Sequence, residues 1–239
     1  MNFFALSERG ISVQNEDSYC AERIDEYWVF AVAEGLSGHP GGEIASGIAV
    51  GHLRQAVHQY PGSPRAALEN AVREADAEIR EASERSPART GMATKITACI
   101  ADAGLHGTLL DAGNGGALVI TPDSVRPARD SAIPARHPGS TGNHPGNVWP
   151  PFLSDMVSHT LGAPRRLQNS DFHEIDLEET FLLLTSEGLT DFVRTDEIGK
   201  IVRANGGNLE ASCEELVQAA LSAGSDDTIT LVLVQGISD

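Results

Sequence analysis

Four acidic residues stand next to apolar runs that are far apart in the sequence. Glu34 and Glu187 each follow such a run, Asp227 directly precedes another, and Asp17 closes the acidic turn sequence QNED. A short apolar run bounded by turn residues predicts a buried strand. A carboxylate at the end of a buried strand is costly unless it is paired or holds a cation. Four converging carboxylates would make a hard-cation site built from oxygen ligands.

Short blocks of sequence around these acids form an ordered series. They are NEDSY at 15–19, AEGLSGH at 33–39, GMATKITA at 91–98, DAGN at 111–114, HTLG at 159–162, TSEGLTD at 185–191 and SDDTIT at 225–230. In this order the blocks resemble the type 2C metal-dependent protein phosphatases, the PPM family, in its bacterial single-domain form. The resemblance covers nearly the whole chain, and the series is far more specific than any one block.

The sequence alone predicts an α+β fold with antiparallel meanders. The first third predicts two strands and then two helices, at 43–60 and 65–85, and a further helix is predicted at 209–223. The resemblance implies a four-layer α/β/β/α sandwich, with two packed antiparallel sheets flanked by helix pairs, in a single domain over 1–239. Residues 123–158 are rich in Pro, Gly and His and predict a long loop or flap.

The resemblance also implies a pair of divalent cations, Mn²⁺ or Mg²⁺, that activate a bridging water for attack on phosphorus. Their ligands would be the carboxylates of Glu34, Glu187 and Asp227 and the backbone carbonyl of Gly35, with Glu34 bridging the two ions. The residues expected to carry catalysis are Asp17, Glu34 and Asp227.

Acids and a histidine next to these ligands are assigned supporting roles. Asp17 and Glu16 match family acids that orient metal-bound waters. Alternatives remain for three of these residues: Asp17 and Asp227 could simply cap turns, and Glu16 could be a solvated surface acid. His39 is expected to be a structural loop residue, with contact to a metal-bound water as its alternative.

The chain departs from the family at several chemical positions. Glu34 and Glu187 stand where the family usually has Asp, and one methylene moves a carboxylate by ~1.5 Å, enough to disturb a precisely spaced site. Asn114 replaces the acid that holds a third metal in many bacterial members. Ser12 stands in place of an arginine that grips the substrate phosphate, and Arg9 is the nearby candidate to replace it.

Two functions follow from this pattern. The leading prediction is metal-dependent hydrolysis of phosphoserine and phosphothreonine on proteins, opposing a Ser/Thr kinase in signalling. The alternative is a catalytically weak or inactive pseudophosphatase that binds a phosphoprotein or partner. Retained carboxylates at the two Glu positions favour the first, whereas the changes at Asn114 and Ser12 favour the second.

Composition restricts the partners and the compartment. The formal net charge is −17, which argues against nucleic acid and anionic membranes as partners, since both need a positive surface. The three cysteines, Cys20, Cys99 and Cys213, are widely spaced and predict reduced thiols. No signal peptide or spanning segment is apparent. We therefore expect a cytoplasmic monomer whose partner is a phosphorylated protein.

Overall fold

The computed structural model of the protein describes residues 1–113, 116–128, 160–163 and 171–237, and these contain two five-stranded sheets in which every pairing is antiparallel. The first sheet has the order β1 (Asn2–Glu8), β10 (Ile229–Gln235), β9 (Phe181–Thr185), β6 (Gly116–Ile120) and β7 (Val125–Pro127). The second has the order β2 (Asp17–Ile24), β3 (Tyr27–Gly35), β4 (Thr94–Ala101), β5 (His106–Ala112) and β8 (Asp171–Asp176).

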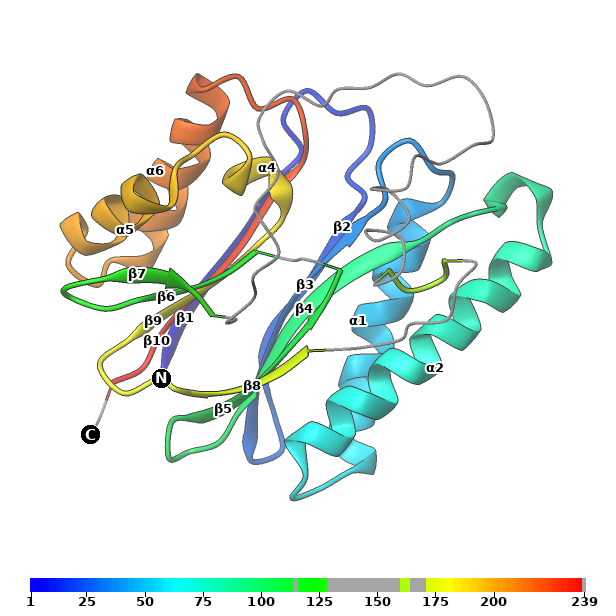
Figure 1. The fold of residues 1–239 in the computed structure, drawn as a ribbon, viewed down its shortest axis with the longest axis horizontal. Helices are drawn as coiled ribbons and strands as arrows, with labels where there is room; N and C mark the ends of the chain where they lie inside the picture. Colours follow the sequence, from blue (N-terminus) through cyan, green and yellow to red (C-terminus); the bar gives the residue numbers. More distant parts are fainter. Residues whose placement is uncertain (114–115, 129–159, 164–170, 238–239) are drawn as a thin grey trace.

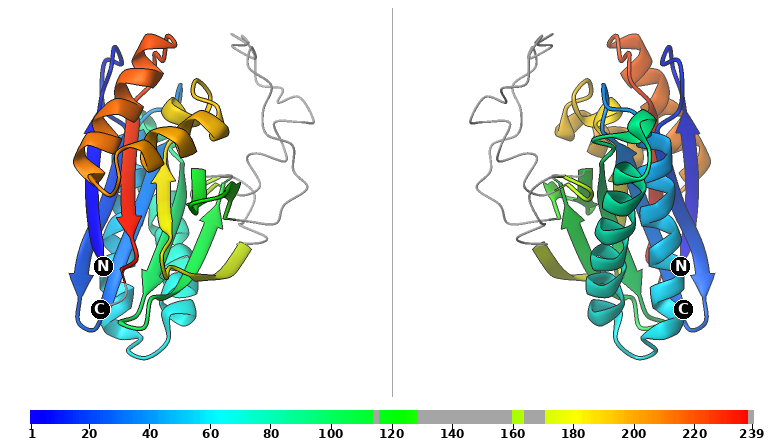
Figure 2. Two further views of the ribbon diagram at one scale, coloured as in Figure 1. Left: turned by 90° about the vertical axis from the view of Figure 1, so that its left-hand side faces the viewer. Right: turned by 90° about the vertical axis from the view of Figure 1, so that its right-hand side faces the viewer.

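Helices cover the outer face of each sheet (Figures 1 and 2). The second sheet is covered by α1 (Gly42–Gln59) and α2 (Pro64–Glu84), and a short 3₁₀ turn (Pro87–Arg89) follows them. The first sheet is covered by α4 (Glu187–Thr190), α5 (Thr195–Ala204) and α6 (Leu209–Ser222). The predicted α+β class and the α/β/β/α layering are confirmed. None of the helices in the described ranges is long and apolar enough to cross a membrane.

The inner strands β3, β4, β9 and β10 bury both of their faces, and side-chain alternation divides their residues between separate cores. In β3, Val29, Ala31 and Ala33 pack towards α1 and α2, while Phe30 and Val32 pack between the sheets. The other sheet behaves alike: alternate residues of β10 face α6 or the space between the sheets. This two-sided burial explains why the strands read as continuous apolar runs rather than as alternating patterns.

Local sequence signals explain where two of the helices begin. Pro64 is the first residue of α2, directly after Ser63, where its fixed φ suits the first helical turn. The side chain of Asn208 accepts a hydrogen bond from the Ala211 N–H at 3.2 Å and so caps α6. These helices begin at Pro64 and Leu209, within one residue of the predicted starts at 65 and 209, although the Ser63 side chain makes no capping hydrogen bond.

The structure differs from the sequence-based expectation at three strands. Three strands, rather than two, precede the first helix. The start of the expected loop at 123–158 contains β7, which pairs with β6, and 129–158 lies outside the described residues. Strand β8 was not expected, because its sequence DFHEID mixes polar and apolar residues. Whether 1–239 forms one domain stays a prediction.

Candidate active site

Three charged residues lie side by side at one end of the second sheet. In the strand register, Asp17 of β2 is opposite Glu34 of β3, and Glu34 is opposite Lys95 of β4. Phe30 and Val32 precede Glu34 on the face between the sheets, so alternation points Glu34 into the same space. These three residues therefore lie at the end of the sheet, and Glu34 points into the space between the two sheets.

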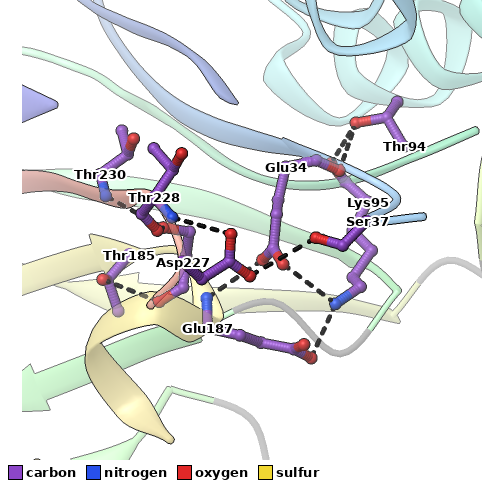
Figure 3. A network of polar contacts seen from close by, with 10 residues as sticks. Glu34, Ser37, Thr94, Lys95, Thr185, Glu187, Asp227, Thr228 and Thr230 are labelled. Atoms are coloured by element: carbon purple, nitrogen blue, oxygen red, sulfur yellow. Dashed lines mark hydrogen bonds and ion pairs between the residues drawn. The ribbon is translucent and has the colours of Figure 1, made fainter. Parts of the chain in front are cut away.

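The first sheet contributes two further carboxylates. Glu187 begins α4, directly after β9, and Asp227 lies in the turn before β10. These segments approach closely because Gly188 has no side chain: a Cβ there would lie 2.1 Å from the backbone oxygen of Thr228. This approach brings Asp227 near the start of α4, and Figure 3 shows the side chains of Glu34, Glu187 and Asp227 in the same region.

A lysine ammonium lies between two of these carboxylates (Figure 3). The Nζ atom of Lys95 is 2.7 Å from Oε1 of Glu187 and 3.5 Å from Oε1 of Glu34. The other carboxylate oxygen of Glu34 accepts a hydrogen bond from the Glu187 N–H at 3.1 Å. Asp227 accepts hydrogen bonds from the Thr228 N–H at 2.7 Å and the Ser37 hydroxyl at 3.4 Å.

Burial and mutual repulsion raise the pKa values of the acids at this site. Burial raises the pKa of Asp17 to about 6, although the nearby hydroxyls of Thr230 and Ser186 lower it in part. Burial also raises the pKa of Glu34, a shift that the charge of Lys95 opposes and that of Glu187 increases. These carboxylates are therefore held in a place that disfavours negative charge without a cation.

Glu16 interacts electrostatically with the same group of acids. Burial raises its pKa, and so do the charges of Glu43 and Asp227. Its backbone oxygen accepts the Gly35 N–H at 3.0 Å. A Cβ on Gly35 would meet that oxygen at 2.8 Å and the Gly42 backbone at 2.6 Å, so only glycine fits where the β3 end, the 16–17 turn and α1 meet.

The other predicted site residues take different positions. The ring Nδ1 of His39 lies 3.1 Å from the carbonyl oxygen of Gly91, a contact that ties the loop after β3 to the start of β4. The guanidinium of Arg9 donates to the Val13 carbonyl at 2.8 Å within its own loop. Ser12 ties this loop to the carbonyl of Asp226 at 3.1 Å. Asn114 lies outside the described residues.

The oxygen donors have the right chemistry for a hard divalent cation, but their arrangement does not fit a pair of ions. Lys95 already provides a positive charge between Glu34 and Glu187. Within the described residues, no group of three or more His, Cys, Asp or Glu side chains is placed to hold a metal ion. Metal could bind between these two glutamates only after the ammonium has moved away.

Lys95 is the residue that sequence reasoning missed. In the sequence it belongs to the block GMATKITA, in which no role is predicted for it. Two signals could have revealed it: Lys95 and Lys200 are the only lysines in the sequence, and Lys95 stands in a run that otherwise lacks charge. A lysine in a buried strand needs a carboxylate partner, and the nearby acidic blocks supplied the candidates.

Several solved structures share this fold. A bacterial serine phosphatase superposes with a TM-score of 0.78 at 19% identity, covering 98% of this chain and 96% of the other. The catalytic domain of the phosphatase PstP, described as a complex with two manganese ions, gives a TM-score of 0.77 at 23% identity, covering 99% and 98%. The fold is thus that of the bacterial serine/threonine phosphatases.

Sequence comparison gives the family. Models described as protein phosphatase 2C match residues 8–129 and 168–229, and the chain belongs to the protein phosphatase 2C family. PstP of Mycobacterium tuberculosis is 26% identical over 98% of this chain, which spans 44% of that relative's length. A serine/threonine phosphatase, stp, of Listeria innocua is 25% identical over 96% of this chain and 93% of its own length.

Proposed function

We propose that this chain hydrolyses phosphoserine and phosphothreonine on proteins and so opposes a Ser/Thr kinase. The observation that carries the proposal is the gathering of Glu34, Glu187 and Asp227, with Asp17 beside them, where the two sheets end. Membership of the protein phosphatase 2C family and the names of its relatives support the same reaction.

The chain's own residues have distinct tasks in this proposal. With Lys95 withdrawn, the carboxylates of Glu34, Glu187 and Asp227 and the Gly35 carbonyl would hold divalent cations, Mn²⁺ or Mg²⁺. Such ions supply an activated water and offset charge on the phosphoryl oxygens. Asp17, whose pKa is raised to about 6, would accept a hydrogen bond or a proton from water in the cleft.

Residues at the rim would position the substrate. The charge of Asp227 contributes to the raised pKa of Glu16, so the two carboxylates lie close enough to interact, and Glu16 would orient bound water. Arg9 lies in the loop that Ser12 ties to Asp226. If its guanidinium left the Val13 carbonyl, it would offer a cation to the substrate phosphate.

Lys95 favours a second candidate, a pseudophosphatase that binds a phosphoprotein or partner without hydrolysis. Because Lys95 compensates the charge of the acids, the protein can remain folded without bound metal. Such a protein can bind a partner without being a catalyst. In either case the partner we propose is a phosphorylated protein, and the chain acts as a cytoplasmic monomer.

Phosphopeptide turnover separates the two candidates. Purified protein is given phosphoserine and phosphothreonine peptides in Mn²⁺, in Mg²⁺ and in chelator, with Asp227→Asn as the control variant. Metal-dependent phosphate release that Asp227→Asn abolishes would support hydrolysis. Saturable peptide binding without phosphate release in any of the metals would support the binding module instead.

A further inference from the structure

Lys95 has a precise structural setting. It lies near the start of β4, opposite Glu34 in the register, on the side of the strand that faces the other sheet. The hydroxyl of Thr94 donates to the Glu34 backbone oxygen at 2.7 Å, which fixes the two strands at this level. The lysine therefore points at the carboxylates because of the sheet register, not because of a flexible loop.

The lysine stem also has space reserved for it. A Cβ on Gly113 would lie 2.6 Å from Cγ and 2.8 Å from Cβ of Lys95, at a backbone φ of +112°. A side chain at position 113 would therefore collide with the lysine stem. Since the methylenes pack against this glycine, the ammonium is directed to the acids.

The ion group is almost closed to solvent. The side chains of Lys95, Glu34 and Glu187 are 6%, 12% and 20% exposed. Screening by water is weak in such a place, so each contact is stronger than a surface ion pair. The second carboxylate oxygen of Glu34 accepts a hydrogen bond from the Glu187 N–H, so both oxygens of Glu34 have partners.

A metal ion and this ammonium cannot hold the same two carboxylates. Divalent cations bind carboxylate oxygens at about 2.0–2.2 Å, whereas Lys95 is already within 2.7 Å of Glu187. Two cations placed so close together would repel strongly in a poorly solvated cleft. Binding of metal at this position consequently requires the lysine side chain to leave.

We propose that the Lys95 ammonium is a built-in counter-cation that competes with divalent metal for Glu34 and Glu187. The affinity of the cleft for Mn²⁺ is thus set by how readily the lysine side chain is displaced. This inference rests on the metal site of the proposed function, and it assigns Lys95 as a positioning residue that acts through the two glutamates.

The test measures metal binding directly, by titration calorimetry of metal-free protein with Mn²⁺ and by the rise in melting temperature. Lys95→Met removes the charge and keeps the length of the stem. Lys95→Arg keeps a charge, and Lys200→Met removes the chain's other lysine, which pairs with Asp196 on the surface. We expect Lys95→Met to bind Mn²⁺ at least about tenfold more tightly than the wild type, and Lys95→Arg and Lys200→Met to gain nothing.

Each outcome decides the inference. Equal Mn²⁺ affinity in the wild type and Lys95→Met overturns it, as does an equal gain in Lys200→Met. If Lys95→Met does not fold without metal, Lys95→Gln is used and refolding is followed with millimolar Mn²⁺ present. Metal-dependent refolding supports the inference, and failure of both variants to fold with Mn²⁺ overturns it.

The phosphopeptide assay is scored separately from these measurements. A Lys95→Met protein that gains Mn²⁺ affinity but releases no phosphate would leave the inference standing and remove the proposed hydrolysis. A wild-type protein that hydrolyses phosphopeptides while Lys95→Met shows unchanged Mn²⁺ affinity would do the opposite. Failure of one proposal is therefore distinguishable from failure of the other.

Discussion

Removal of the lysine from the metal-free protein should expose how strongly the ion group is coupled. The ammonium is 2.7 Å from Glu187 and 3.5 Å from Glu34. At an effective dielectric constant of about 20 these separations correspond to gross attractions of about 6 and 5 kcal/mol. Most of this offsets the cost of taking the charges out of water, which is several kcal/mol for each ion.

The net effect of Lys95→Met is therefore dominated by the two carboxylates that it leaves uncompensated. We expect it to lower the free energy of unfolding by about 3–5 kcal/mol in chelator. Glu187→Gln in the same background should cost little or restore stability, because it removes one of the unpaired charges. The double-mutant cycle should thus give a coupling of about 2 kcal/mol.

Urea denaturation of the four proteins at neutral pH supplies these free energies. The matched control is the cycle of Lys200 and Asp196, an i,i+4 pair on α5 at 3.3 Å whose side chains are 72% and 52% exposed. Solvent screens that pair, so its coupling should be indistinguishable from zero. A coupling between Lys95 and Glu187 no larger than that of the surface pair would refute our account of the ion group.

Further predictions concern the buried acid Asp17 and the close approach of α4 to the turn before β10. Between pH 3.8 and about 6, Asp17 keeps its proton in the folded state but loses it in the unfolded state, because its pKa is raised from 3.8 to about 6 on folding. The stability of the wild type therefore falls as the pH rises through this window. The stability of Asp17→Asn relative to the wild type, measured by urea denaturation, should therefore rise by up to about 3 kcal/mol from pH 4 to pH 7, and a flat difference would contradict it. Gly188→Ala should lower stability by about 3 kcal/mol, because its Cβ would meet the Thr228 backbone at 2.1 Å. The control Gly51→Ala, in α1 with open space around it, should be neutral or about 0.5–1 kcal/mol more stable in the same assay.

The sequence alone predicted the α+β class, because burial on both faces of the inner strands leaves a clear pattern of apolar runs, whereas the α/β/β/α layers were implied by the resemblance to the family. The sequence did not predict β7 and β8, which lie at the edges of the sheets. Strand β7 has three residues and ends at Pro127, and β8 carries His173 and Glu174 among its apolar residues. Such edge strands are short and partly polar, so periodicity alone does not separate them from loops.

The acids of the site could be found from the sequence, but their pairing could not. Each of Asp17, Glu34, Glu187 and Asp227 adjoins a predicted buried strand, which places them at strand ends. The distances between these acids in the fold depend on the register of the strands and on the close approach of Gly188 to the Thr228 backbone. The role of Lys95 could not be predicted for the same reason, because its partners Glu34 and Glu187 lie on β3 and α4, far from it in the sequence.

Lys95 also gives a physical account of the two glutamates that replace the aspartates usual in the family. An aspartate at position 34 or 187 would end about 1.5 Å short of the present carboxylate, and would move away from the ammonium. Both longer side chains instead reach the same Nζ atom, so the three residues form one unit rather than three independent changes. The four carboxylates nevertheless exceed the single ammonium in charge, and burial keeps the pKa of Asp17 and Glu34 raised despite it. A lysine in this position therefore compensates the charge of these acids only in part, and the uncompensated charge is what would allow a metal ion to compete with it, as we propose.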